Sequence, residues 1–336
     1  MSDLFEPRDN IKPLEYPICE DYVEAIRQSY WVHTEFNFTT DIQEYHTELN
    51  DYQREVIKKC LLLISQVEVG VKTFWCNLHR HIPKPEVLGV GATFGESEKR
   101  HLDAYSALLE ILGLNEEFEK IKEIPAVNDR HVYLTKYKEF STARLEENFL
   151  KSIILFSLFI ENVSLFSQFF IIQSFNKHRK WLVDINNVVA ATSKEEAIHG
   201  MFGTWLINQI KEEHPDFFND ELKKLIYLYS RKAYRAEEKL LKWIFPDGDL
   251  IFEPTVDGCK PDHIKILEVK DFIKNRLNES LTGIGLDPIF DVNEARLEKT
   301  RWFDEKLIAG VHVDFFNQRP TNYVRKNKAI SENDLF

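Results

Sequence analysis

Two Glu-x-x-His motifs are the residues best suited to chemistry in this sequence. One joins Glu98 to His101 and the other joins Glu196 to His199. On a helix this spacing places the carboxylate and the imidazole on one face, where both can bind the same metal ion. The motif alone is weak evidence, because roughly one match is expected by chance in 336 residues that include 11 His and 35 Glu.

Two further carboxylates lie inside apolar runs. Glu68 lies between Val67 and Val69, and Glu161 follows Phe159 and Ile160. Burying an unpaired carboxylate is costly, and bound metal ions offset that cost. Taken singly, such an acid is commonly a helix cap or a residue assigned to the wrong face, and a His near a Glu is commonly a surface pair.

The order of these residues along the chain is what favours a metal site. Ferritin-like di-iron and di-manganese proteins take one Glu from each of two helices and Glu-x-x-His from each of two others. This chain offers Glu, Glu-x-x-His, Glu and Glu-x-x-His in sequence. The predicted ligands of two metal ions are therefore Glu68, Glu98, His101, Glu161, Glu196 and His199. Oxygen-rich ligation with two imidazoles suits iron or manganese better than zinc or copper.

Long helices must position these ligands. Gly and Pro are few, and the segments between them carry apolar residues every three or four positions, as at Leu61, Ile64 and Val67. The pattern predicts bundle helices over roughly 51–79, 86–112, 142–175 and 179–211, with two more near 221–245 and 263–281. The β-prone stretches near Ile251 and Val311 are too few for a sheet domain. We expect an all-α, ferritin-like helical bundle with the dinuclear site in its core.

Composition excludes several other classes. A formal net charge of -12 repels phosphate backbones, so no direct nucleic-acid binding is expected. The four Cys form no C-x-x-C pair, which disfavours a zinc knuckle or a disulfide framework and fits a reducing compartment. The N-terminus lacks the pattern of a secretory signal, and the apolar stretch 149–175 is interrupted by Lys151 and Glu161. We therefore expect a cytoplasmic protein with no membrane span.

The last twenty residues differ from the rest. Residues 317–336 are polar and end in the apolar pair Leu335 and Phe336. We expect a bundle domain over 1–316 and a flexible C-terminal tail over 317–336, with the tail's end as an anchor for a partner.

With the six predicted ligands in place, the chain resembles the radical-generating (beta, small) subunit of class I ribonucleotide reductases over most of its length. Tyr105 stands four residues after His101, where many members carry their radical tyrosine. Leu165 and Phe169, four and eight residues after Glu161, resemble the family's apolar pocket around the cluster.

The resemblance also implies a route for the radical. Trp31, ahead of the first bundle helix, resembles the family's radical-transfer tryptophan, and Glu195 occupies the place of the acid that links it to a metal-bound histidine. Tyr323 resembles the tyrosine that relays the radical to the catalytic alpha subunit, to which the tail docks. The alternative for Tyr323 is a merely solvated terminus.

The activity implied is that of a ribonucleoside-diphosphate reductase subunit beta. The metal pair is oxidised by an oxygen species and supplies one oxidising equivalent to a cysteine of the alpha subunit, which reduces ribonucleotides to deoxyribonucleotides. The family also implies a homodimer. The absence of a Gly-rich phosphate loop agrees with this division of labour.

One residue departs from the commoner pattern. The first ligand is usually Asp in the di-iron, tyrosyl-radical members, whereas this chain has Glu68. Glu occurs there in manganese-iron members, which replace the radical tyrosine by Phe, and in dimanganese members activated by superoxide. Glu68 together with Tyr105 most resembles the dimanganese group, class Id.

Lys72 follows Glu68 by one helical turn on the same face. An ammonium group there would attract an anionic oxidant such as superoxide and would oppose removal of an electron from Tyr105. The alternative is that Lys72 extends to solvent.

Other functions remain open at this stage. The same subunit could hold di-iron with a tyrosyl radical, or a mixed manganese-iron pair. A ferritin-like diiron oxidase acting on a small substrate needs a pocket that the bulky residues Tyr105, Leu165 and Phe169 would fill. An iron store would need no such tail, and a purely structural helical protein would bind no metal.

Overall fold

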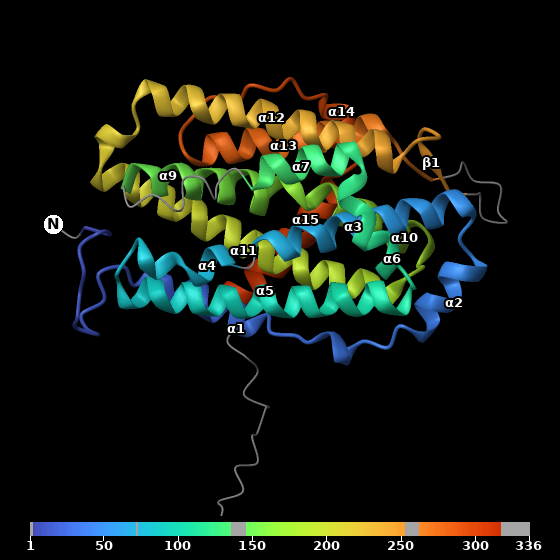
Figure 1. The fold of residues 1–336 in the computed structure, drawn as a ribbon, viewed down its shortest axis with the longest axis horizontal. Helices are drawn as coiled ribbons and strands as arrows, with labels where there is room; N and C mark the ends of the chain where they lie inside the picture. The colour runs from blue at the N-terminus through green and yellow to red at the C-terminus, as the bar shows by residue number, and fades with distance from the viewer. Residues whose placement is uncertain (1–2, 72, 136–145, 253–261, 317–336) are drawn as a thin grey trace, which may run out of the picture.

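The protein folds as a bundle of long helices whose axes run mostly along the length of the molecule (Figure 1). The computed structural model describes residues 3–71, 73–135, 146–252 and 262–316. The only strands in these ranges are two short ones, β1 (Leu250–Ile251) and β2 (His263–Ile264), which pair antiparallel with Leu250 opposite Ile264. The prediction of an all-α fold is confirmed.

Four helical segments carry the predicted metal ligands. They are α3 (Asp51–Val71), α5 (Pro85–Ile111), the segment formed by α9 (Glu146–Ile153), η4 (Ile154–Ser164) and α10 (Phe166–Arg179), and α11 (Val183–Glu213). Helix α5 begins with Pro85, whose fixed φ and missing N–H suit the first helical turn. Packing of α3 on α5 and α10, and of α11 on η4, α10 and α5, encloses the core.

Further helices cover this core. Helix α1 (Ile18–Gln28) packs on α5, α12 (Asp220–Ile244) and α13 (Ile266–Gly283) pack on η4, and α15 (Arg301–Phe316) packs on α1 and α11. The short helices are η1 (His33–Glu35), α2 (Thr39–Thr47), α4 (Thr73–Cys76), η2 (Leu78–Arg80), α6 (Asn115–Lys120), η3 (Ile121–Glu123), α7 (Pro125–Leu134), η5 (Pro215–Phe217) and α14 (Glu294–Leu297).

The sequence predicted six of these helices and missed others. Its bounds are close for α5, α11, α12 and α13, whereas the helix expected over 51–79 ends at Val71 as α3 and is followed by α4 and η2. The β-prone interpretation near Val311 is wrong, because that residue is buried within α15. Packing against α1 and α11 overrides the local β-propensity of the valines there.

The helix expected over 142–175 is not uniform. Its middle eleven residues, Ile154–Ser164, wind as a π-helix. Side chains support this winding, since Asn162 Nδ2 donates to Ser157 O at 2.9 Å and Ser164 Oγ donates to Phe159 O at 2.9 Å, each five residues back. A π-helical turn inside an α-helix commonly marks a functional site, and Glu161 lies in this one.

The same segment is the one helix in the described ranges that is apolar and long enough to cross a membrane. In Glu146–Arg179, 89% of the most apolar window is buried inside the protein. It is therefore placed as a core helix, which agrees with the expectation of a buried helix. Lys72, Tyr323 and the whole tail 317–336 lie outside the described residues, so the domain division at 316 stays a prediction.

Candidate metal centre

All six predicted ligands meet in the middle of the bundle. Glu68 comes from α3, Glu98 and His101 from α5, Glu161 from η4, and Glu196 and His199 from α11. Each is at most 1% exposed to solvent. The (i, i+3) spacing of the two motifs works as expected, because each Glu and its His face the same interior space.

The ligand atoms form two overlapping groups. The first half-site consists of Glu68, Glu98, His101 and Glu196, and the second half-site consists of Glu98, Glu161, Glu196 and His199. Within each group one ligand atom per residue lies within 4.8 Å of all the others. Glu98 and Glu196 belong to both groups, so each of these carboxylates would help to hold both ions.

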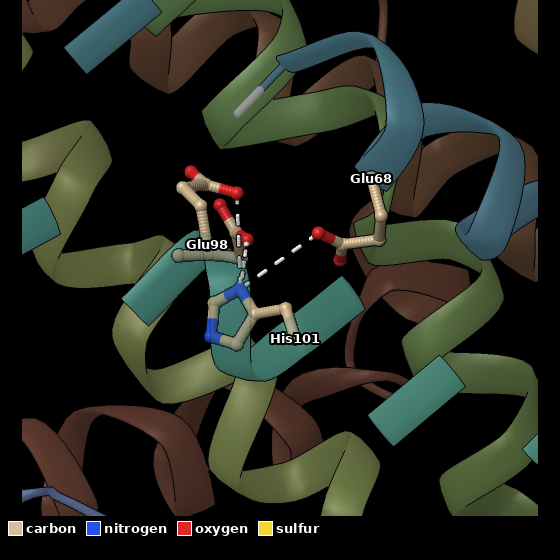
Figure 2. A group of neighbouring side chains, drawn as sticks. Glu68, Glu98 and His101 are labelled. Atoms are coloured by element: carbon tan, nitrogen blue, oxygen red, sulfur yellow. Dashed lines mark ion pairs between the residues drawn. The ribbon is translucent and has the colours of Figure 1, made fainter. Parts of the chain in front are cut away.

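Distances between individual atoms agree with this division. His101 Nδ1 lies 3.1 Å from Glu196 Oε1 and 3.9 Å from Glu68 Oε2. His199 Nδ1 lies 3.3 Å from Glu98 Oε1 and 3.5 Å from Glu161 Oε2. Figure 2 shows the carboxylate of Glu68 reaching from α3 toward the ring nitrogen of His101, on α5, that also faces Glu98.

The ligand atoms are polar, buried and unsatisfied by the protein. Eight of these atoms form no hydrogen bond in the described residues. They are the two oxygens of Glu68, the two oxygens of Glu98, Glu161 Oε2, Glu196 Oε1, His101 Nδ1 and His199 Nδ1. Buried polar atoms without partners are rare, because each costs free energy. Two cations bound between them would satisfy all of these atoms, so the residues present fit a dinuclear metal centre.

Electrostatics in the metal-free protein agree with this fit. Burial raises the pKa of Glu68 and Glu161 well above the usual range and raises that of Glu98. Burial acts oppositely on the imidazoles, but the neighbouring carboxylates hold the pKa of His101 and of His199 well above its ordinary value. Protons therefore neutralise the cluster when no metal is bound, and metal ions must displace them.

The outward nitrogen of each histidine has a different partner. His101 Nε2 donates to Glu195 Oε2 at 2.8 Å, and His199 Nε2 lies 2.9 Å from Ser97 Oγ. These contacts fix the ring orientations and leave each Nδ1 facing the cluster. Although burial opposes it, the hydrogen bond from His101 and the charge of Arg100 hold the pKa of Glu195 below its ordinary value.

Trp31 lies beside this network. Its ring stacks on that of His101 with centroids 6.1 Å apart and an interplanar angle of 20°. Arg100 Nη1 donates to Trp31 O at 3.2 Å and to Glu195 Oε1 at 3.1 Å. The Trp31 indole N–H forms no hydrogen bond in the described residues, so Trp31 is connected to Glu195 through Arg100, while its ring stacks on His101.

Tyr105 is fully buried on α5, one turn after His101. Burial and the nearby Glu68 carboxylate raise the pKa of its phenol well above the usual value, and Thr192 offsets part of that effect. Leu165 and Phe169 are also buried, but the π-helical winding of η4 shifts their angular position relative to Glu161, so counting from Glu161 as on an α-helix no longer applies. Their pocket role stays a prediction.

Sequence reasoning missed several residues that shape the site. Trp75 Nε1 donates to Glu161 Oε1 at 3.2 Å, and the Phe94 ring lies 4.3 Å from that of His199. Arg100 and Ser97 support the two histidines. Ser97 precedes the first Glu-x-x-His motif and Arg100 lies inside it, which marks both as neighbours of ligands but not as partners of the histidines. Trp75 and Phe94 resemble ordinary core residues in sequence.

Comparison with known proteins agrees with this geometry. The family model "Ribonucleotide reductase, small chain" matches residues 8–296. A probable ribonucleoside-diphosphate reductase small subunit of Invertebrate iridescent virus 3 is 25% identical over 96% of this chain and 86% of its own length. The ribonucleoside-diphosphate reductase subunit beta of Chlamydia pneumoniae is 26% identical over 94% and 90%.

Solved structures share the fold. A putative class I ribonucleotide reductase from Bacillus halodurans superimposes with a TM-score of 0.74 at 15% identity, covering 85% of this chain and 99% of that one. The dimanganese(II)-NrdF of Streptococcus sanguinis gives a TM-score of 0.71 at 17% identity, covering 91% and 100%. Together with the dinuclear site, the family match shows that the chain belongs to the ribonucleotide reductase small chain family and is the beta subunit of a ribonucleoside-diphosphate reductase.

Proposed function

We propose that this subunit belongs to class Id, so that its site holds two manganese ions, superoxide is the oxidant, and one oxidising equivalent passes to the catalytic subunit. The observation that carries the proposal is the pairing of Glu68 with Tyr105. Glu68 places a glutamate, not an aspartate, in the first half-site, and its carboxylate faces His101 at 3.9 Å. Tyr105 keeps a tyrosine in the family's radical position without the surroundings that its oxidation needs.

Those surroundings matter because oxidising a phenol at neutral pH requires a group that accepts its proton. The Tyr105 hydroxyl forms no hydrogen bond to a carboxylate or an imidazole among the described residues. Burial and the negative charge of Glu68 raise its pKa, so its proton is held tightly. Both features favour storage of the oxidising equivalent on the metal pair rather than on Tyr105.

A bound metal pair would supply the redox chemistry that generates the oxidising equivalent. The protein shields the metal pair from solvent and connects it to the surface. Six ligands, each at most 1% exposed, exclude water from the site. His101 donates its Nε2 proton to Glu195, and Arg100 ties Glu195 to the backbone of Trp31, so electron and proton shifts can be coupled along this route. From Trp31 the proposed route leads through Tyr323 to the alpha subunit, to which the tail docks.

Metal reconstitution tests the proposal. Apo-protein would be loaded in parallel with manganese and with iron, then exposed to oxygen with and without a superoxide source, and followed by electron paramagnetic resonance. We expect about two manganese per chain, a coupled mixed-valent dimanganese signal that depends on superoxide, and turnover with the alpha subunit. A sharp tyrosyl signal that appears only with iron would contradict the proposal and assign the radical to Tyr105.

Lys72 belongs to the same proposal as the group that attracts the anionic oxidant. Replacing it with Met removes the charge while keeping similar length, and we expect slower activation by superoxide with unchanged manganese content. Unchanged activation kinetics would remove Lys72 from the mechanism. We further propose a homodimer, which sedimentation of the loaded protein would test.

A further inference from the structure

Two glycines on α11 lie where the π-helix comes closest. A Cβ built on Gly203 would lie 1.8 Å from Ser157 Oγ and 2.3 Å from Ser157 Cβ. A Cβ on Gly200 would lie 2.1 Å from Asn162 Oδ1 and 2.7 Å from Asn162 Cγ. Real Cβ atoms do not approach other atoms this closely, so α11 and η4 can pack at this separation only because both positions lack a side chain.

The same two helices supply ligands of the second half-site. Gly200 follows His199 directly and Gly203 lies one turn beyond it, while Ser157 and Asn162 bracket Glu161 on η4. The i→i+5 winding of a π-helix brings residues four and five apart onto one face. Ser157, Glu161 and Asn162 can therefore all face α11 together, which an α-helical turn would prevent for Asn162.

Other contacts also hold η4 in this position. Arg276 of α13 donates from Nε to Asn162 O at 2.6 Å, and its guanidinium lies 3.5 Å from the centre of the Phe166 ring. The Ser157 hydroxyl is fully buried and forms no hydrogen bond in the described residues, although it points at Gly203. A buried hydroxyl without a hydrogen-bond partner does not stabilise the fold by hydrogen bonding. The contact between Ser157 and Gly203 therefore acts through close packing.

We propose that Gly200 and Gly203 are positioning residues for the second metal ion. They let η4 approach α11 closely enough for Glu161 Oε2 and His199 Nδ1 to lie 3.5 Å apart, within reach of one ion. Metal–ligand distances tolerate changes of only about 0.2 Å, so an added methyl group that moves η4 outward should weaken the second half-site. The first half-site takes no ligand from η4 and should keep its affinity.

This inference rests on the dinuclear centre of the proposed function but on neither the identity of the metal nor the oxidant. Titration of wild-type apo-protein with Mn(II), followed by electron paramagnetic resonance of the free ion, tests the dinuclear centre by itself, because two ions per chain must bind. The variants then test the glycines. A failure of the proposed dinuclear centre is thus distinguishable from a failure of the proposed role of the two glycines.

The test adds a methyl group on α11 and then removes the facing side-chain atoms on η4. Gly203→Ala and Gly200→Ala should each retain one tight Mn(II) and weaken the other by on the order of tenfold or more, the range found for residues that orient metal ligands. The doubles Gly203→Ala with Ser157→Gly, and Gly200→Ala with Asn162→Ala, remove the opposing atoms and should restore the second ion. Gly89→Ala on α5 is the matched control, because a Cβ there meets only Val23 Cγ2 at 4.0 Å.

Two outcomes would overturn the inference. One is full binding of both ions by the single alanine variants. The other is an equal loss of both ions, or a loss that the paired substitutions do not reverse, since either would mean that the glycines support the fold in general rather than the second half-site. Thermal unfolding and Mn(II) titration of Ser157→Gly alone and of Asn162→Ala alone, beside each apo-variant, separate these cases from misfolding and from loss of the hydrogen bond between Asn162 and Ser157 O.

Discussion

The two half-sites use nearly the same ligands in different surroundings. His101 of the first half-site donates its outer N–H to an ionised carboxylate, Glu195, which Arg100 also binds. His199 of the second half-site lies against a neutral hydroxyl, Ser97, and among the rings of Phe94 and Trp75. One half-site is therefore connected to charged groups, and the other is enclosed by aromatic ones.

This difference separates two tasks that one centre must perform. A charged network with a stacked tryptophan suits passage of an electron and a proton out of the first half-site. An aromatic enclosure on a π-helical segment suits a ligand such as Glu161, whose carboxylate is held at one oxygen by Trp75 and is unpartnered at the other. We expect substitutions in the first surroundings to affect radical transfer, and substitutions in the second to affect metal binding.

The largest effect should come from removing a carboxylate that both half-sites share. Glu98→Ala removes a ligand from both groups, whereas Glu68→Ala removes one from the first group alone. We expect Glu98→Ala to lose nearly all tight metal binding, and Glu68→Ala to keep about one ion per chain. Metal analysis after desalting gives the ratio directly.

The control is the fold of each variant without metal, followed by circular dichroism. Both carboxyls have pKa values raised by burial, so removing either should leave the apo-protein folded. If Glu68→Ala loses both ions while folded, the two half-sites do not bind independently and the comparison between them fails.

The next effect concerns the partners of the histidines. Glu195→Gln keeps the shape of the side chain but removes the charge that Arg100 and His101 share, and we expect turnover with the alpha subunit to fall by about 10- to 100-fold. Ser97→Ala removes only a neutral partner of His199 and should cost a few-fold. Metal content must be matched between variants. Equal losses in both would show that the charge on the first half-site has no special role.

The sequence predicted the ligands of both half-sites better than it predicted their surroundings. The ligands follow from carboxylates inside apolar runs and from (i, i+3) pairs, which are local patterns. Arg100, by contrast, becomes important only because α5, α11 and the segment after α1 meet, and no local pattern reports that meeting. The helices α1 and α15 were missed for the same reason, since their place depends on packing against each other and the core.

The π-helix was beyond the sequence argument for another reason. Seven of the eleven residues of Ile154–Ser164 are apolar, so the hydrophobic periodicity of this short segment cannot distinguish winding by i→i+4 from winding by i→i+5. The segment packs closely against Gly200 and Gly203 of α11, about forty residues downstream, and Asn162 O accepts a hydrogen bond from Arg276 of α13. A single sequence gives no sign of such a contact, and the interpretation of Leu165 and Phe169 from α-helical spacing is affected by it.

The release of protons on metal binding should make the metal affinity depend on pH, an effect of intermediate size. Because burial raises the pKa of Glu68, Glu98 and Glu161, the metal-free cluster holds protons at pH values where an ordinary glutamate has lost them. Metal must displace these protons, so affinity should rise with pH and weaken as pH falls below neutral, by about tenfold per pH unit for each net proton released per ion.

Calorimetry in two buffers of different ionisation enthalpy counts these protons. In Glu195→Gln, His101 loses the anionic partner that raises its pKa, so the proton count should fall for the ion of the first half-site and stay unchanged for the second. An unchanged count for both ions would mean that Glu195 does not distinguish the two histidines.

The smallest expected effect tests the aromatic enclosure itself. Trp75→Phe keeps a ring against Phe94 but removes the N–H that donates to Glu161 Oε1 at 3.2 Å. A hydrogen bond from one neutral donor to a carboxylate contributes at most about 1.5–3 kcal/mol of stabilisation. A metal ion bound to Glu161 replaces part of this stabilisation, so we expect the affinity for the second ion to fall only a few-fold. The first ion should be unaffected, since Glu68 and His101 form no contact with Trp75 among the described hydrogen bonds and ring contacts. Mn(II) titration measures both ions in one experiment. A larger loss at the first half-site than at the second would mean that the two surroundings are not separate, because the enclosure would then act on the centre as a whole.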